Sequence, residues 1–415
     1  MKIGIKRIDS INGKVKISGS KNTALPIICA SLLTNKTITL KNVPMITDVL
    51  ILLDIIKEIG CYVKINKKNG TVKIKAKRVT STVLTNKVTK LRGSYYLIGT
   101  LLARYHKCII SYPGGCGFTS RPIDYHIDVF NQLGFEIVEK NKIIFIKEKR
   151  IYKNIIIIKN KSVGASINAL LASSLIENQI IIKNILLEPE VLEVINYLRL
   201  LGKEICINGE EIMLTNSIEN KSITFTITGD RIEAGSYMLL ASAFKYSQLE
   251  IINSPIIYLK EVINVVRQLG VHVEIEKDII KIKTNDYINS INLVIKEYPS
   301  FPTDLQQILS VVLLKANGVS TVEDKIYPSR ISQIKELKKM KANIEYENSI
   351  IKIYPSTLVG TEVVSHDLRC SFALLLAGLV AEDETIIDNF ELSFRGYENI
   401  IDKIKNLGIY INIYY

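Results

Sequence analysis

The sequence predicts an α/β protein made of six copies of one structural unit, arranged as two domains with helices inside and sheets outside. Two patterns lead to this prediction, and each occurs six times along the 415 residues. The first is a helix end followed at once by alternating strands, and the second is an apolar helix of about three turns. Self-similarity at a fixed period indicates a repeat architecture. A chain of this length also exceeds what one hydrophobic core usually supports, which favours two domains.

The first pattern places a small residue at the end of an amphipathic helix, directly before strands in which apolar and polar residues alternate. Glu58-Ile-Gly-Cys-Tyr-Val-Lys-Ile65 is its first copy, and successive copies are 66 to 74 residues apart. A glycine here is typical of a helix C-terminus, because it adopts the left-handed conformation without strain. Ala342 replaces the glycine in the fifth copy, and the other five small residues are Gly60, Gly134, Gly202, Gly270 and Gly408.

The second pattern is a helix that is apolar nearly all round, with small residues interspersed. A helix of this kind is buried rather than lying on the surface. A short strand, a loop, a more amphipathic helix and the paired strands follow it. Because one such unit cannot bury its central helix alone, we expect three units to pack together in each domain. The apolar helices are expected at residues 23–33, 94–105, 165–176, 234–244, 305–314 and 370–380.

The N-terminal segment, residues 1–18, has a strand pattern but no helical unit of its own. We expect it to complete the domain formed by the last three units. The predicted domains are therefore residues 1–20 with 229–415, and residues 21–228. An active-site cleft is expected between them.

Composition favours a soluble enzyme. Apolar residues make up 47% of the chain and charged residues 23%, and no apolar run is long enough to span a bilayer. The formal net charge is +13, but the lysines are scattered, so attraction of small polyanionic substrates fits better than nucleic-acid binding. The first residues, Met1–Lys6, lack an apolar segment, so no signal peptide is expected.

The cysteines indicate a reduced, cytoplasmic protein. The six cysteines form no CxxC pair, so the sequence suggests neither a zinc site nor a disulfide framework. Cys116 differs from the rest, because it lies in the glycine-rich loop Tyr112–Pro122, five residues before Arg121. An exposed thiol beside an arginine is a candidate reactive group, although a quiet surface loop remains the alternative. We expect the other five to be buried: Cys29, Cys61, Cys108, Cys206 and Cys370.

Cations recur at the starts of the apolar helices. Lys21 and Arg92 stand there without a neighbouring acid in the sequence, whereas Arg231 and Arg369 follow aspartates. A cation at a helix N-terminus costs a few tenths to about 1 kcal/mol unless an anion is shared with the backbone N–H groups. A single case is explained by solvation, but the recurrence favours an anion-binding cleft.

Other units supply further candidates. Ser162-Val-Gly-Ala-Ser166 opens the third apolar helix without a charge, and its N–H groups suit a phosphate or a uracil edge. Arg330 and Arg395 occupy the loop position that holds Cys116 and Arg121 in the second unit. Asp304 begins the fifth helix, where it is either a stabilising first-turn acid or a general base.

Six motifs follow one another along the chain: Lys21-Asn-Thr-Ala-Leu-Pro26, Pro113-Gly-Gly-Cys-Gly117, Arg121-Pro-Ile-Asp-Tyr-His126, Pro302-Thr-Asp304, Asp367-Leu-Arg369 and Arg395-Gly-Tyr-Glu398. In these motifs the chain resembles the UDP-N-acetylglucosamine 1-carboxyvinyltransferases, a family of enolpyruvyl transferases, along its full length. This resemblance implies two inside-out α/β barrel domains of three repeats each, as in EPSP synthase. It also implies transfer of the enolpyruvyl group of phosphoenolpyruvate to the 3-hydroxyl of UDP-N-acetylglucosamine, without a metal or cofactor.

The resemblance also implies roles for individual residues. Cys116 would protonate the methylene carbon of phosphoenolpyruvate and form a covalent adduct with it, and Asp304 would take the proton of the sugar hydroxyl. Phosphoenolpyruvate would contact Lys21, Asn22, Arg121, Arg330, Arg369 and Arg395. The nucleotide sugar would contact Arg92, Arg121, Pro122, Ile123, Asp124, Tyr125, Ser162, Val163, Gly164, Asp304 and Ile326.

The sequence departs from the family pattern in two places. Asn160 stands where a nucleotide-contacting lysine is expected, and either Lys159 or Lys161 could replace it. The loop Gly117-Phe-Thr-Ser120 is bulkier than usual, which affects the expected closure of this loop. Two other functions remain open: enolpyruvyl transfer to shikimate 3-phosphate, and nucleic-acid binding by a basic repeat protein.

Overall fold

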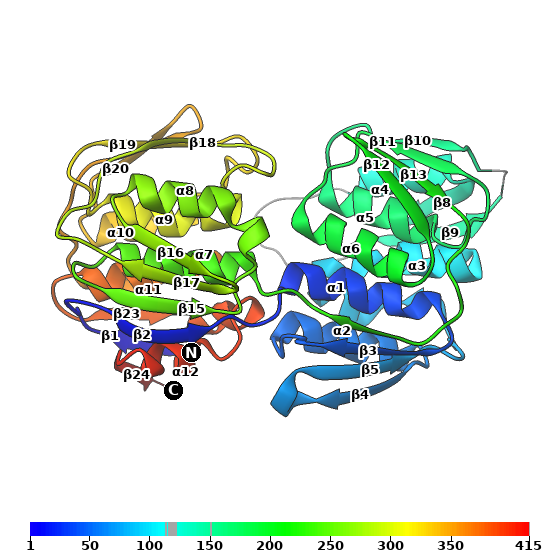
Figure 1. Ribbon diagram of the computed structural model, residues 1–415, viewed down its shortest axis with the longest axis horizontal. Helices are drawn as coiled ribbons and strands as arrows, with labels where there is room; N and C mark the ends of the chain where they lie inside the picture. The colour runs from blue at the N-terminus through cyan, green and yellow to red at the C-terminus, as the bar shows by residue number, and fades with distance from the viewer. Residues whose placement is uncertain (113, 115–122, 150–151, 415) are drawn as a thin grey trace. The chain divides into compact units, whose positions relative to one another are not determined.

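The computed structural model describes residues 1–112, 114, 123–149 and 152–414. The chain forms two compact units (Figure 1). Unit 1 comprises Met1–Ser18 and Gly229–Tyr415, and unit 2 comprises Gly19–Thr228. Three of the predicted site residues, Cys116, Arg121 and Pro122, lie outside the described residues.

The described residues of unit 2 form three four-stranded sheets and six α-helices. In each sheet the first two strands are parallel and the other pairs are antiparallel. The sheet orders are β14(Ile223–Thr226)-β3(Thr37–Lys41)-β5(Thr71–Lys75)-β4(Tyr62–Asn66), β6(Val83–Leu84)-β7(Lys107–Ser111)-β9(Ile143–Glu148)-β8(Phe135–Lys140) and β10(Ile155–Ile157)-β11(Ile180–Lys183)-β13(Glu211–Thr215)-β12(Glu204–Asn208). The central helices are α1 (Lys21–Ala30), α3 (Tyr96–Tyr105) and α5 (Val163–Ala172), and the others are α2 (Thr47–Glu58), α4 (Asp124–Gln132) and α6 (Pro189–Leu200).

Unit 1 repeats this arrangement (Figure 1). Its sheets are β2(Asn12–Lys16)-β15(Gln248–Ile252)-β17(Ile279–Lys283)-β16(His272–Glu276), β18(Asn292–Ile295)-β19(Ser320–Asp324)-β21(Ile350–Ile353)-β20(Ile344–Glu347) and β22(Glu362–Val364)-β23(Thr385–Asp388)-β1(Lys2–Ile5)-β24(Ile411–Tyr414). The central helices are α7 (Arg231–Ser242), α9 (Gln306–Leu313) and α11 (Leu368–Val380), and the others are α8 (Lys260–Gln268), α10 (Ser332–Lys339) and α12 (Ile400–Asn406).

Burial follows from the sequence pattern. All twelve residues of α11 from Arg369 to Val380 are buried, and α7 is buried from Ile232 to Ser242. In the strands, apolar side chains alternate with exposed polar ones, as β5 shows with Val72 and Ile74 buried. Each unit therefore has its own core, formed by its central helices and the inner faces of its sheets.

The helix ends confirm the glycine pattern except in the fifth copy. The five glycines of the first pattern all have positive φ, between 77° and 96°. In the fifth copy the left-handed residue is Lys341, with φ 68°, and Ala342 is the residue after it. The expectation that Ala342 replaces the glycine is therefore wrong by one position. A left-handed lysine costs about 1–2 kcal/mol, which the packing of α10 has to offset.

Two glycines mark the points where the chain passes from one unit to the other. A Cβ on Gly19 would lie 1.8 Å from the carbonyl oxygen of Asn42, and one on Gly229 would lie 2.1 Å from that of Asn253. Both asparagines have positive φ. Their side-chain amides donate to the carbonyls of Ile227 (2.8 Å) and Ile17 (2.7 Å), so each crossing segment is fastened within its own unit.

One cysteine prediction is wrong. Cys29, Cys61, Cys108 and Cys370 are buried, but Cys206 is exposed. It lies on β12 between the buried Ile205 and the partly buried Ile207, so the strand alternation turns it outward. Within the described ranges, no helix combines the length and the apolar character that crossing a membrane requires.

Candidate active site

The predicted base, Asp304, lies in a cluster of arginines in unit 1. It belongs to the short 3-10 helix η6 (Thr303–Leu305), which leads directly into α9. The Nε of Arg369 donates to Asp304 Oδ1 at 3.1 Å, and Nη1 of Arg330 lies 3.3 Å from the same oxygen. The structure thus brings together three predicted site residues that are distant in the sequence.

Helix caps explain how the arginines reach this place. Asp367 is the N-cap of α11, and its carboxylate accepts from the backbone N–H groups of Arg369 (2.8 Å) and Cys370 (3.0 Å). Asp230 caps α7 in the same manner, directly before Arg231. The aspartates occupy the N–H groups of the helix start, which stabilises the helices although each carries a cation in its first turn.

The arginines control the charge of Asp304. Its side chain is 27% exposed, and burial alone would raise its pKa. The charges of Arg330 and Arg369, the hydrogen bond from Arg369 and the charge of Arg231 outweigh this effect and hold the pKa of Asp304 well below its ordinary value. Asp304 is therefore an ionised carboxylate at neutral pH.

The same arginine cluster contains buried N–H donors that make no hydrogen bond. Among the described residues, Nη1 of Arg369 is buried without a hydrogen-bond acceptor, and the buried Nη1 of Arg330 makes no hydrogen bond beyond its ion-pair contact with Asp304. Leaving such donors without a partner costs about 1–3 kcal/mol each or more. Arg369 is held in place by Tyr397, whose ring lies 5.2 Å away and whose hydroxyl is 2.9 Å from that of Ser236. The arrangement is prepared to accept an anion.

Arg395 is positioned by the glycine that follows it. It ends the 3-10 helix η7 (Phe390–Arg395), and Gly396 lies against the start of α11. A Cβ on Gly396 would be 2.2 Å from Cδ1 of Leu368 and 3.5 Å from Nη1 of Arg369. The lack of a side chain at Gly396 therefore lets the segment that carries Arg395 approach Arg369.

Asp324, which the sequence analysis missed, connects two parts of this cluster in unit 1. Its carboxylate accepts from the hydroxyl of Thr303 at 2.5 Å and from the backbone N–H groups of Ile326 (2.9 Å) and Tyr327 (2.8 Å). Thr303 is the neighbour of Asp304, and the predicted residue Ile326 begins the loop that leads to Arg330. No local pattern could have revealed this role, because Asp324 is simply the last residue of β19.

In unit 2, Lys21 has an acidic partner. It is the first residue of α1, after the N-cap Ser20, and its Nζ lies 3.3 Å from Oδ2 of Asp48. The expectation of an uncompensated cation is therefore wrong for Lys21. Asp48 comes from the first turn of α2, 27 residues away, and the Lys21 and Asp48 side chains are 13% and 5% exposed. Asn22 is the next residue of α1 and is partly exposed.

The predicted nucleotide-sugar residues of unit 2 surround a buried histidine. Arg92 begins the 3-10 helix η4 (Arg92–Tyr95) and lies 5.7 Å from the Tyr95 ring, which packs at 4.6 Å against His126. The amide of Asn168 lies 2.8 Å from Nδ1 of His126. Burial lowers the pKa of His126 to about 3, with a further contribution from the charge of Arg92, so the imidazole is neutral.

Gly164 lets the start of α5 approach this aromatic pair. A Cβ at this position would lie 2.7 Å from Cε1 of His126 and 2.9 Å from the hydroxyl oxygen of Tyr95. Ser162 caps the helix by accepting from the N–H of Ala165 at 3.3 Å. The segment Ile123–Tyr125 is at the start of α4, the helix that also carries His126. The expected residues Arg92, Ile123–Tyr125 and Ser162–Gly164 thus lie around His126, which the sequence analysis did not select.

The two lysines beside Asn160 both have acidic partners. Nζ of Lys159 is 2.8 Å from Asp128, and Nζ of Lys161 is 2.6 Å from Glu210. Both pairs are partly exposed to solvent, so they contribute little to stability and can exchange for another anion.

Comparison with known proteins identifies the class. The EPSP synthase (3-phosphoshikimate 1-carboxyvinyltransferase) family matches residues 5–404. The chain therefore belongs to this family of enolpyruvyl transferases, and it is a transferase that acts on small-molecule substrates.

Its relatives point to one branch of the family. The chain is similar to UDP-N-acetylglucosamine 1-carboxyvinyltransferase 2 of Staphylococcus aureus strain Mu50, with 38% identity over 404 residues, 96% of this chain and 95% of that protein. It is equally similar to the Staphylococcus epidermidis protein of the same name, with 38% identity over 410 residues, 98% of this chain and 97% of that protein.

Solved structures confirm the fold class. The enolpyruvyl transferase NikO from Streptomyces tendae has a TM-score of 0.90 at 19% identity, covering 99% of this chain and 98% of that chain. EPSP synthase from Acinetobacter baumannii has a TM-score of 0.80 at 18% identity, with full coverage of both chains. The prediction of two inside-out α/β domains is correct.

Proposed function

We propose that the protein transfers the enolpyruvyl group of phosphoenolpyruvate to the 3-hydroxyl of UDP-N-acetylglucosamine and releases inorganic phosphate. Relatives that match nearly the whole chain at 38% identity carry the name of this activity. The observation that carries the proposal is the position of Asp304, a carboxylate held by two guanidinium groups at the start of a buried helix. It combines a proton acceptor with sites for an anionic substrate.

Asp304 accepts the proton of the sugar hydroxyl as the hydroxyl oxygen attacks C2 of phosphoenolpyruvate. In the unliganded protein the arginines make Asp304 a weak base, because they hold its pKa far down. An anionic substrate that takes over Arg330 and Arg369 removes part of this stabilisation and raises the pKa of the carboxylate. Substrate binding therefore strengthens the base at the moment when it is needed.

Cys116 supplies the proton that C3 of phosphoenolpyruvate gains in the addition step. The product of addition is a tetrahedral intermediate in which C2 carries both the sugar oxygen and the phosphate. Phosphate leaves as C3 loses a proton, which restores the double bond in the enolpyruvyl product. The thiol can also add to C2, which gives the covalent adduct expected for this family.

The cations hold the charge of the substrate and of the intermediate. Phosphoenolpyruvate and a diphosphate together carry about five negative charges, and fixed cations stabilise them without rearrangement. Lys21 and Asn22 contribute from unit 2, and Lys21 is oriented by Asp48. Four arginines complete this set: Arg121, Arg330, Arg369 and Arg395.

The nucleotide sugar is proposed to bind in a cleft between residues 1–20 with 229–415 and residues 21–228. The first domain contributes Asp304 and Ile326. The second contributes the surroundings of His126, where backbone N–H groups at the start of α5 suit a uracil or a phosphate. The residues of this second set are Arg92, Arg121, Pro122, Ile123, Asp124, Tyr125, Ser162, Val163 and Gly164.

This activity is the first committed step of peptidoglycan synthesis, so we place the protein in the cytoplasm and in cell-wall formation. Addition and elimination need only acids, bases and fixed cations, and we propose neither a metal nor a cofactor. We also propose no nucleic-acid or protein partner.

A phosphate-release assay with two acceptors tests the function. With phosphoenolpyruvate present, we expect phosphate release with UDP-N-acetylglucosamine and none with shikimate 3-phosphate. Turnover with shikimate 3-phosphate alone would replace the proposal by the reaction that the family description names. Turnover with neither acceptor would reject both.

A further inference from the structure

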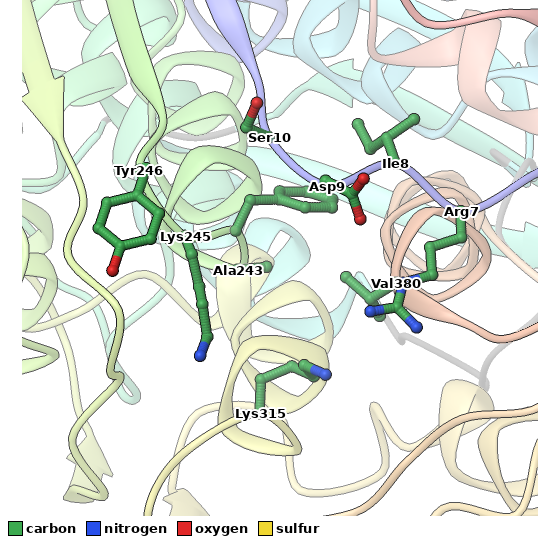
Figure 2. A pocket seen from close by; sticks show the side chains of 10 residues that line it. Arg7, Ile8, Asp9, Ser10, Ala243, Lys245, Tyr246, Lys315 and Val380 are labelled. Carbon is green, nitrogen blue, oxygen red and sulfur yellow. The ribbon is translucent and has the colours of Figure 1, made fainter.

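A pocket of about 380 Å³ lies at the far end of the central helices of unit 1. The ends of α7, α9 and α11 contribute Ala243, Lys315 and Val380, and residues 7–10 between β1 and β2 complete it (Figure 2). Asp304 and Arg369 lie where α9 and α11 begin, so the pocket is at the opposite end from the proposed active site. Its volume is in the range of about 300–1,000 Å³ that small-molecule sites occupy.

Three cations line this pocket, which we call the basal pocket. They are Arg7, Lys245 and Lys315, and Asp9 is the acid among the lining residues. Figure 2 shows Lys245 on one side, Arg7 on the other and Lys315 between them. Within the described part of the chain, none of the three side chains forms an ion pair or a hydrogen bond.

The helix ends explain only part of this charge. A helix C-terminus attracts cations, because its last carbonyl groups are unpaired. Here backbone N–H groups already reach these carbonyls: Leu379 accepts from Ile8 (3.0 Å), Val312 from Lys315 (3.0 Å) and Ala241 from Phe244 (3.2 Å). The side-chain donors of Arg7, Lys245 and Lys315 are therefore not needed to pair these three carbonyls.

The three cations also repel one another. Partial burial lowers the pKa of Lys315, and the charges of Arg7 and Lys245 lower it further, whereas Glu382 acts in the opposite direction. A bound anion would relieve this repulsion and would form charge-assisted hydrogen bonds with all three groups.

The rest of the pocket suits an organic group. Ile8, Phe244 and Val380 provide apolar surface, and Tyr246 stands at the rim beside Lys245 (Figure 2). The Tyr246 side chain is 70% exposed, and a ring of this kind is a platform on which another ring stacks. Phosphate-binding cations and an aromatic ring thus lie within one small pocket.

We propose that the basal pocket binds an organic phosphate of about the size of a nucleoside monophosphate. The phosphate lies between Arg7, Lys245 and Lys315, and the ring of the ligand packs against Tyr246. The site does not depend on the proposed enolpyruvyl transfer, because it shares no residue with the proposed active site.

Calorimetric titration of the full chain with AMP, with adenosine as the phosphate-free probe, tests this site. Saturating UDP-N-acetylglucosamine is present without phosphoenolpyruvate, so that the proposed nucleotide-sugar site is occupied if it exists and no turnover takes place. We expect AMP to bind, adenosine to bind at least tenfold more weakly, and Lys245→Gln/Lys315→Gln to weaken AMP at least tenfold. The matched control is Lys260→Gln/Lys335→Gln, which removes two exposed lysines of α8 and α10 and should leave AMP affinity unchanged.

The opposite results overturn the proposal. These are the absence of AMP binding, equal affinity of the double variant and the unmodified protein, or equal losses in the double variant and its control. Binding that disappears when UDP-N-acetylglucosamine is added also overturns it, because AMP would then occupy the active site. Phosphate release measured in parallel should be the same in both variants, which separates this test from that of the proposed function.

Discussion

Arg369 donates a hydrogen bond of 3.1 Å from its Nε to Asp304, a residue 65 positions earlier in the chain. The contact joins the start of α11 to the start of α9. Because Arg369 is 4% exposed and fixed by the cap of its own helix, it presents the carboxylate in one defined place. In the proposed mechanism, these two side chains serve as the proton acceptor and as part of the anion site.

The first prediction concerns Asp304 as the base. Asp304→Asn keeps the shape of the side chain but removes the proton acceptor, so we expect turnover to fall by about 10²- to 10⁴-fold. Binding of UDP-N-acetylglucosamine, measured by calorimetry, should change little. The matched control is Asp286→Asn, an exposed acid in unit 1, which should retain full turnover. Full activity of Asp304→Asn would remove Asp304 as the base.

The second prediction concerns the reactivity of Cys116. The epoxide fosfomycin should alkylate this thiol in the presence of UDP-N-acetylglucosamine and add one equivalent to the intact mass. Cys206 is exposed in the described part of the chain, so it provides the control. We expect Cys206→Ser to keep the adduct and Cys116→Ser to lose it. An adduct that persists in Cys116→Ser would assign the reactive thiol elsewhere.

The third prediction uses the tight contact of Gly396. In Gly396→Ala the new Cβ would meet Cδ1 of Leu368 at 2.2 Å, so the segment that carries Arg395 has to move away from Arg369. We expect the displacement of Arg395 to lower turnover by about 10- to 100-fold. Steady-state phosphate release checks this, and adding Leu368→Ala should restore most of the activity. An active single variant would show that Arg395 is not positioned by this contact.

The sequence was sufficient to predict the repeat and the helix starts that carry candidate site residues. Periodicity located the buried helices, and glycines such as Gly60 and Gly270 marked helix ends, because only local backbone geometry decides their conformation. The prediction for the fifth copy was wrong by one residue, because Lys341 and not Ala342 has the left-handed conformation. Asp304 and Arg369 were recognised singly, by their places at helix starts.

Partners from other parts of the chain could not be predicted. Asp48 reaches Lys21 across 27 residues, and Asp324 joins Thr303 to the loop before Arg330. No periodicity encodes such contacts, because they depend on how separate elements pack. His126 was overlooked for the same reason: its neutral state results from burial between Tyr95, Gly164 and Asn168.

The fourth prediction follows from the charge of His126. Its pKa is lowered to about 3 in the folded protein, compared with about 6.5 in an unfolded chain. The unfolded state therefore binds an extra proton between these values, and the free energy of unfolding falls as pH falls from about 6.5 towards 3. The slope from this one group is up to about 1.4 kcal/mol per pH unit.

Urea denaturation between pH 7 and pH 4 measures this effect. His126→Gln removes the titrating group, so its stability should depend less on pH than that of the unmodified protein. The matched control is His272→Gln, whose side chain is 59% exposed and forms a surface contact with Glu274. We expect the control to keep the original pH dependence. If His126→Gln keeps it as well, His126 is not held neutral by burial, and the aromatic pair around Gly164 does not have the packing described here.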